Sequence, residues 1–152
     1  MVDRKSNANR KVRDVMIRDV ITVESGTTLL EAAKKMRDSN IGMLPVTEDR
    51  VVRGVVTDRD LVIRAMTQDV RPSEVRVTEY VSEPPRCAEA DWPLEDAMEE
   101  MARQHVGRLP VVDRDGAVVG VVTLSSLALR SSKREETLET AQEVARRSAR
   151  SA

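Results

Sequence analysis

Three polar residues lie close together in the stretch GVVTDRDL, residues 54–61: Thr57, Arg59 and Asp60. If a helix begins at Thr57, its free N–H groups and positive dipole end attract phosphate oxygens, and Arg59 adds positive charge. A carboxylate one turn into that helix can accept hydrogen bonds from both hydroxyls of a vicinal diol. The same spacing fits a plain helix cap with an acid in the first turn, so this turn alone leaves binding and capping open.

A second copy of the turn bears on that choice. Residues 120–127, GVVTLSSL, keep the glycine, both valines, the threonine and the leucine, but Ser126 stands where the first copy has Asp60. The chain therefore builds the second helix with Thr123 as its cap and no acid. Because folding does not require a carboxylate at this position, the comparison favours ligand binding at the first turn.

Catalytic and metal-binding groups are scarce. The chain has one histidine and one cysteine, too few for a zinc site. In the repeat alignment, His105 corresponds to Asn40 and Cys87 to Thr22, so both occupy positions that an unreactive residue fills in the other copy. We expect a partly exposed helix-end histidine, a strand cysteine, no catalytic residue, no metal and no required cofactor. The sequence predicts a protein that is not an enzyme.

Composition excludes several classes of partner. The 152 residues include 25 basic and 26 acidic side chains, and the net charge of -1 attracts neither nucleic acid nor membrane. One Trp, one Tyr and no Phe leave no aromatic platform for stacking single-stranded bases. No run approaches the roughly 18 apolar residues of a membrane span, and the first eleven residues lack a secretory leader. With a single cysteine, these features predict a cytoplasmic protein without a membrane partner.

The duplication covers a whole folding unit. Leu44-Pro45-Val46 corresponds to Leu109-Pro110-Val111, and the apolar helix positions also match: Leu29, Ala32 and Met36 with Leu94, Ala97 and Met101. Each copy predicts a short strand, a helix, a hairpin and a second helix. In the first copy the strand is DVITVES, the helix is TTLLEAAKKMRDSN, the hairpin joins GMLPVT to VVRGVV, and the second helix begins at Thr57. Neither copy has enough core to fold alone, so the two should pack together.

The helices carry more specific expectations. Thr28 and Glu31 form a capping-box pattern, as do Ser132 and Glu135 before the last helix, and Pro93 suits a first helical turn. The side chains expected to face inward are Leu29, Ala32, Ala33 and Met36 of the first segment; Leu61, Val62, Ala65 and Met66 of the second; and Leu94, Ala97, Met98 and Met101 of the third. The last helix has a thin apolar stripe of Leu138, Ala141, Val144 and Ala145, which could dock on the domain or a partner or stay solvated.

These motifs divide the chain into a flexible tail (1–11), a first repeat (12–66), a linker (67–76), a second repeat (77–130) and a C-terminal helix (131–152). The repeated LPVV-like strand and GVVT turn resemble the CBS-domain family over roughly residues 12–130. The resemblance implies an α+β fold of tandem β-α-β-β-α repeats packed as a pseudo-two-fold pair. It also implies two clefts between the halves, dimerisation through helices, and an adenosine ligand such as AMP, ADP, ATP or S-adenosylmethionine.

By the same resemblance, Thr57 contacts phosphate and Asp60 holds the ribose hydroxyls, with Arg59 beside them. The other walls of this cleft would be Gly42 and Met43 from the first repeat and Pro85, Arg86 and Arg108 from the second. Arg108 could bind phosphate or be an ordinary surface arginine. The second cleft, which we expect to be weak, empty or differently occupied, would comprise Val20, Ile21, Gly107, Thr123 and Ser126.

Two functions of different class follow. The first is a regulatory module, such as an energy sensor, that binds an adenine nucleotide and signals by a conformational or dimer change to an unidentified partner protein. The second is a homodimeric interaction scaffold with clefts that bind nothing. A weaker third possibility is DNA contact through the final ARRSARSA segment, whose arginines also suit the C-terminal end of a helix. Thr57, Arg59 and Asp60 favour the sensor.

Overall fold

The computed structural model describes residues 10–131 and 133–150. These residues form two compact units: residues 21–86 form one, and residues 10–20 with 87–131 and 133–150 form the other. We call them the first unit (21–86) and the second unit.

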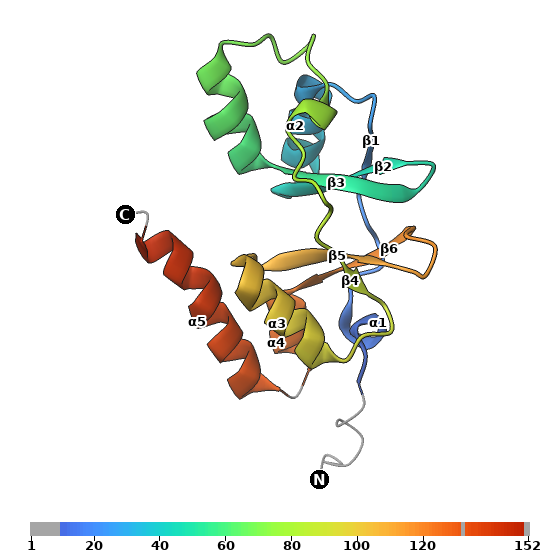
Figure 1. Cartoon of the computed structure of the whole chain (residues 1–152), viewed down its shortest axis with the longest axis vertical. Helices are drawn as coiled ribbons and strands as arrows, with labels where there is room; N and C mark the ends of the chain where they lie inside the picture. Colours follow the sequence, from blue (N-terminus) through green and yellow to red (C-terminus); the bar gives the residue numbers. More distant parts are fainter. Residues whose placement is uncertain (1–9, 132, 151–152) are drawn as a thin grey trace. The chain divides into compact units, whose positions relative to one another are not determined.

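The first unit holds a three-stranded sheet in the order β1-β2-β3 (Figure 1). β1 (Val23–Glu24) runs parallel to β2 (Met43–Glu48), which forms an antiparallel hairpin with β3 (Val51–Thr57). The helical segments are α2 (Leu29–Ser39), η1 (Asp60–Ala65), η2 (Met66–Gln68) and η3 (Val77–Glu79). The apolar side chains of α2 and of the sheet form one buried cluster that includes Leu29, Leu44 and Val56.

The second unit repeats this plan. β4 (Ala88–Glu89) runs parallel to β5 (Arg108–Val112), which pairs antiparallel with β6 (Val118–Thr123). The helices are α1 (Val12–Val15), α3 (Leu94–Gln104), α4 (Leu124–Arg130) and α5 (Arg134–Arg150). The α+β class and the expected order of elements in both repeats are therefore confirmed.

Each unit contains the first segment of the other predicted repeat. Residues 10–20 pack in the second unit, where Ile17 and Val121 exchange main-chain hydrogen bonds of 2.8 and 2.9 Å. Residues 77–86 pack in the first unit, where the Ser82 N–H donates to the Val55 carbonyl at 3.2 Å. These contacts satisfy part of the free edges of β6 and β3, which would otherwise expose unpaired main-chain groups.

Two glycines permit this close approach. A Cβ on Gly54 would lie 2.7 Å from Val81 Cβ, and one on Gly120 would lie 2.6 Å from Met16 Sδ. Real Cβ atoms do not approach other atoms so closely, so glycine is required at both positions.

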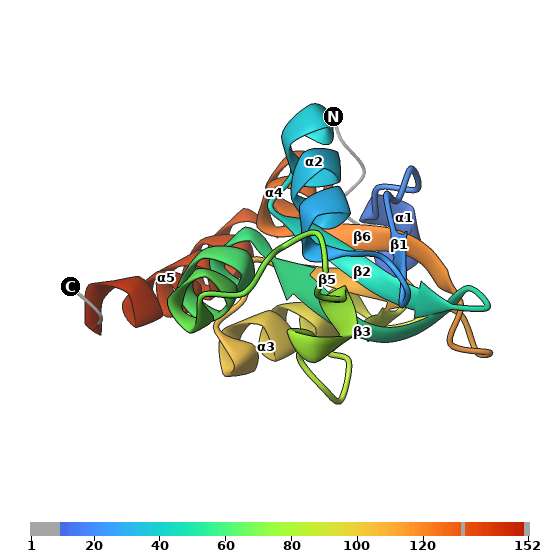
Figure 2. The ribbon, with the colours of Figure 1, turned by 90° about the horizontal axis from the view of Figure 1, so that it is seen from above.

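Helix α5 distinguishes the second unit. It lies alongside α3 and α4 in both views (Figures 1 and 2). Thr137 and Thr140 are buried, and Val144 packs against the core cluster. Of the stripe predicted for this helix, Val144 docks on the domain, whereas Leu138 is 59% exposed and Ala145 is also exposed, and two threonines face the domain instead.

The first unit has no counterpart of α5 among its residues 21–86, and this explains why one residue of α2 that was predicted to be buried is exposed. Met98 of α3 is buried and its side chain contacts Thr137 of α5, whereas Ala33, its counterpart on α2, is exposed. Val62 and Met66 were expected to face inward but are 54% and 71% exposed. Ala128, the counterpart of Val62 on α4, is exposed as well, so this face of the helix lies at the surface in both units.

The capping pattern predicted at Thr28 is confirmed. Thr28 and Glu31 form the expected box, with the Thr28 N–H donating to Glu31 Oε2 at 2.8 Å, and α3 begins directly after Pro93. Residues 1–9 of the expected tail (1–11) and the cap at Ser132 lie outside the described residues. None of the helices in the described ranges combines the length and apolar character needed to cross a membrane.

Candidate ligand-binding turn

The first candidate turn joins β3 to η1 and centres on a reciprocal cap between Thr57 and Asp60. The Thr57 N–H and hydroxyl donate to Asp60 Oδ2 at 2.9 and 2.7 Å, and the Asp60 N–H donates back to Thr57 Oγ1 at 3.2 Å. The capping interpretation that the spacing left open is therefore realised in the structure. It does not exclude binding, because one carboxylate offers about four acceptor sites and these donors fill two of them.

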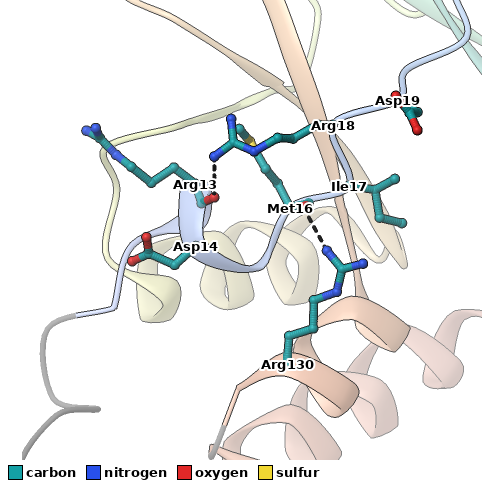
Figure 3. Close-up of a pocket in the computed structure, with 7 residues that line it drawn as sticks. All are labelled: Arg13, Asp14, Met16, Ile17, Arg18, Asp19 and Arg130. Atoms are coloured by element: carbon teal, nitrogen blue, oxygen red, sulfur yellow. Dashed lines mark hydrogen bonds between the residues drawn. The ribbon is translucent and has the colours of Figure 1, made fainter.

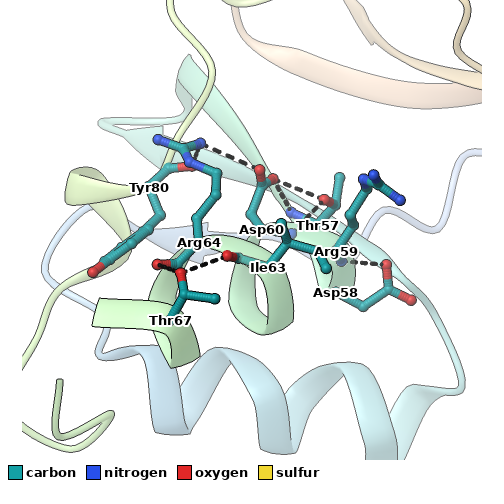
Figure 4. A network of polar contacts seen from close by, with 8 residues as sticks. All are labelled: Thr57, Asp58, Arg59, Asp60, Ile63, Arg64, Thr67 and Tyr80. Carbon is teal, nitrogen blue, oxygen red and sulfur yellow. Dashed lines mark hydrogen bonds and ion pairs between the residues drawn. The ribbon is translucent and has the colours of Figure 1, made fainter. Parts of the chain in front are cut away.

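The second carboxylate oxygen faces an arginine that the sequence analysis missed. Arg64 Nη1 lies 3.2 Å from Asp60 Oδ1 and donates to the Tyr80 carbonyl at 2.9 Å (Figure 4). The guanidinium also lies over the Tyr80 ring, 5.7 Å from its centroid. The signal in the sequence was the spacing of four residues between Asp60 and Arg64, which brings side chains together on a helix.

The helix after the turn is wider than an ordinary α-helix. Residues Asp60–Ala65 form a π-helix, and the Met66 N–H bonds back to the Leu61 carbonyl. π-helical turns are rare and occur frequently at functional sites. The Asp60 side chain, 16% exposed, therefore stands at the start of an unusual helix with one acceptor site of Oδ1 unfilled by the described residues.

Three other predicted site residues lie on or beside this turn. Met43 is the ladder partner of Thr57 in the β2–β3 hairpin and is buried. Gly42 lies against Asp58, since its carbonyl accepts the Asp58 N–H at 3.0 Å and a Cβ at residue 42 would lie 2.7 Å from Asp58 Oδ2. Arg59 is exposed and forms no ion pair within the described part of the chain.

The remaining predicted walls are divided between the units. Pro85 and Arg86 belong to the first unit with the turn, whereas Arg108 belongs to the second. Arg108 starts β5, where it is the ladder partner of Thr123 rather than of any residue of the first turn. Of the second-cleft residues, Val20, Gly107, Thr123 and Ser126 belong to the second unit and Ile21 to the first.

The second turn reproduces the cap without the acid. The Thr123 N–H donates to Ser126 Oγ at 3.0 Å, and the Ser126 N–H donates to Thr123 Oγ1 at 2.9 Å. The Ser126 hydroxyl donates in turn to the Thr123 carbonyl at 2.9 Å, and its side chain is buried. A hydroxyl therefore completes the same cap that a carboxylate completes in the first turn.

Neither reactive residue type forms a site. Cys87 directly precedes β4, and burial raises the pKa of its thiol to about 11. His105 ends α3 in the left-handed region, as its counterpart Asn40 ends α2, and its Nδ1 lies 3.2 Å from the Glu143 carbonyl. The described residues contain no group of three or more metal-binding side chains.

Comparison with known proteins decides the family. The CBS domain family matches residues 12–66 and 77–133. The chain belongs to the CBS domain family. The CBS domain-containing protein YhcV of Bacillus subtilis is 39% identical over 128 residues, which cover 82% of this chain and 87% of YhcV.

Solved CBS structures agree with the fold. A crystal structure of Hypoxic Response Protein I with two coordinated zinc ions has a TM-score of 0.73 at 30% identity, covering 79% of this chain and 98% of the other. The CBS domain pair of protein MJ0100, in complex with 5′-methylthioadenosine and S-adenosyl-L-methionine, has a TM-score of 0.69 at 27% identity. That match covers 79% of this chain and 94% of the other.

Proposed function

We propose that this CBS-domain pair is a non-catalytic regulatory module that binds an adenosine-type ligand through the Thr57–Asp60 turn. The observation that carries the proposal is the difference between the two turns. Both close the same reciprocal cap, but only the first does so with a carboxylate that has an acceptor site to spare. The adenosine compounds in the MJ0100 structure support this ligand class.

The chemistry of the turn suits a ribose. Asp60 Oδ1 accepts one hydrogen bond, from Arg64, so it can accept a second from a sugar hydroxyl. The Thr57 hydroxyl can rotate away from Oδ2, which frees that oxygen for the second hydroxyl of the diol. Arg59, exposed beside the turn, supplies positive charge for a phosphate or for another anionic group.

Other predicted walls complete the proposed site. Gly42, Met43, Pro85 and Arg86 come from the same unit as the turn. Arg108 stays in the proposal as a phosphate ligand, although its ladder partner is Thr123. The second site, at Val20, Ile21, Gly107, Thr123 and Ser126, would bind adenosine ligands weakly because it lacks the acid.

Isothermal titration with AMP, ADP, ATP and S-adenosylmethionine in turn tests the proposal. We expect at least one ligand to bind, and Asp60→Ala to weaken it by about 10- to 100-fold, or about 1.5 to 3 kcal/mol. Ser126→Ala, the matched change in the second turn, should leave that affinity unchanged. Absence of binding by all four ligands, or equal binding by Asp60→Ala, would contradict the proposal.

A specific feature favours a homodimer alongside ligand binding. Leu30, Val62, Ile63 and Met66 are exposed on α2, η1 and η2 of the first unit, whose residues 21–86 include no counterpart of α5. A second copy of the chain could bury this face. Sedimentation of the wild type against Val62→Glu checks it: a dimer in the wild type and a monomer in the variant is the expected result.

A further inference from the structure

An arginine that follows the capping turn in both repeats has different partners in the two units. Arg64 and Arg130 occupy the same repeat position, each four residues after the capping residue of its turn. Arg64 is neutralised by Asp60, 3.2 Å away. Arg130 follows Ser126 and has no such carboxylate, and its Nη1 donates instead to the Met16 carbonyl at 3.0 Å.

A cavity adjoins this arginine. It has a volume of about 460 Å³ and lies wholly within the second unit, between residues 13–19 and the end of α4 (Figure 3). Its charged lining comprises Arg13, Arg18, Arg130, Asp14 and Asp19. Three guanidinium groups and two carboxylates belong to this lining, a formal excess of one positive charge.

Asp14 also has a structural role, although it keeps its negative charge. Its Oδ2 accepts the Lys11 N–H at 2.8 Å, as part of the cap of α1. Arg18 donates to the Arg13 carbonyl at 3.2 Å. Within residues 10–131 and 133–150, neither Arg18 nor Arg130 forms an ion pair with a carboxylate.

Arg13 differs from these two. It forms an ion pair with Asp91, a carboxylate that Lys11 and Arg114 also approach, at 3.4 and 3.8 Å. One acid thus serves three cations and cannot neutralise all of them, so Arg13 keeps only part of its positive charge. The two uncompensated guanidinium groups are Arg18 and Arg130.

From these contacts we propose that the cavity binds a phosphate group, with Arg18 and Arg130 as its ligands and Arg13 as a supporting charge. Planar guanidinium groups match phosphate oxygens with paired donors, and main-chain carbonyls leave most of those donors free. The two repeats would then bind different classes of ligand. In the first repeat a carboxylate accepts hydrogen bonds from hydroxyls, and in the second, where Ser126 replaces the acid, an arginine binds an anion. This inference does not depend on the proposed nucleotide site.

The test is a titration of the ¹⁵N-labelled full chain with inorganic phosphate at constant ionic strength, with sodium chloride as the matched arm. We expect saturable amide shifts in residues 13–19 and 127–131 with phosphate and not with chloride. Arg130→Gln should weaken this binding by about tenfold, the value of one charge-assisted contact. A further arm uses glycerol phosphate, a phosphomonoester, to distinguish free phosphate from a phosphorylated small molecule. If it binds more tightly than inorganic phosphate, the site is assigned to a phosphorylated small molecule.

Two further variants make the result decisive. Ser126→Asp restores the acid beside Arg130 and should weaken phosphate binding as much as Arg130→Gln does, and an acid in the first turn of α4 is compatible with folding. Arg64→Gln, the matched change in the first unit, should leave the shifts at residues 13–19 unchanged. Equal shifts with chloride, or unchanged phosphate affinity in Arg130→Gln and Ser126→Asp, would overturn the proposal.

Discussion

Replacing Asp60 with serine separates its structural role from its proposed binding role. The substitution converts the first turn to the arrangement already present in the second, where Ser126 exchanges bonds of 3.0 and 2.9 Å with Thr123. The N-terminal cap should therefore survive. Asp60→Ala, in contrast, leaves the Thr57 N–H without its side-chain acceptor and also removes the charge.

The expected magnitudes follow from the contacts. Asp60→Ser keeps a cap worth about 1 kcal/mol and loses the Arg64 pair. Because the Arg64 side chain is 46% exposed, that pair contributes no more than about 1 kcal/mol. We expect Asp60→Ser to unfold within about 1 kcal/mol of the wild type and Asp60→Ala to lose about 1 to 2 kcal/mol.

Urea unfolding and ligand titration are measured on the same preparations. Asp60→Ser should keep nearly all its stability but bind the adenosine ligand about 10- to 100-fold more weakly, because a hydroxyl replaces the charged acceptor. A loss above about 2 kcal/mol in Asp60→Ser would refute the view that folding does not require the acid. Unchanged affinity would remove Asp60 from the binding site.

Two predictions concern packing and reactivity. Gly54→Ala should lower the free energy of unfolding by about 1 to 3 kcal/mol, since the new methyl group would lie 2.7 Å from Val81 Cβ, whereas Gly107→Ala meets only Leu124 at 3.5 Å and should have little effect in the same urea experiment. Equal losses in both would show that the close approach of the 77–86 segment is not the cause. Cys87, with a thiol pKa of about 11, should react slowly with iodoacetamide at pH 8 and faster as the pH rises toward 11; a rate at pH 8 equal to that of the urea-unfolded chain would contradict its burial.

The relation between the two repeats shows how much the surroundings of a residue matter. Ala33 and Met98 occupy matching helix positions, and the periodicity predicted both to be buried. Only Met98 is buried, because α5 packs over α3. A pattern within one helix identifies a candidate inward face, but whether that face is covered depends on elements far away in the sequence.

The features that the sequence alone determined are those that depend on interactions between residues close together in the chain. Strands, helices and the caps at Thr28 and Thr123 follow from spacings of two to four residues, so the repeat order, the α+β class and the family could be read from the chain. Asp60 and Thr57 were identified in the same way. The ribose role assigned to them stays a prediction that the titration tests.

Only the tertiary structure decided which segments complete each unit. Residues 12–17 pack beside β6 and residues 77–82 beside β3, so the Arg64 contact with Tyr80 and the Arg130 contact with Met16 join residues 16 and 114 positions apart. No local periodicity encodes such contacts, because they arise when a sheet edge and a glycine without a side chain leave room for a distant segment. The uncompensated charge of Arg130 became visible only once that packing was known.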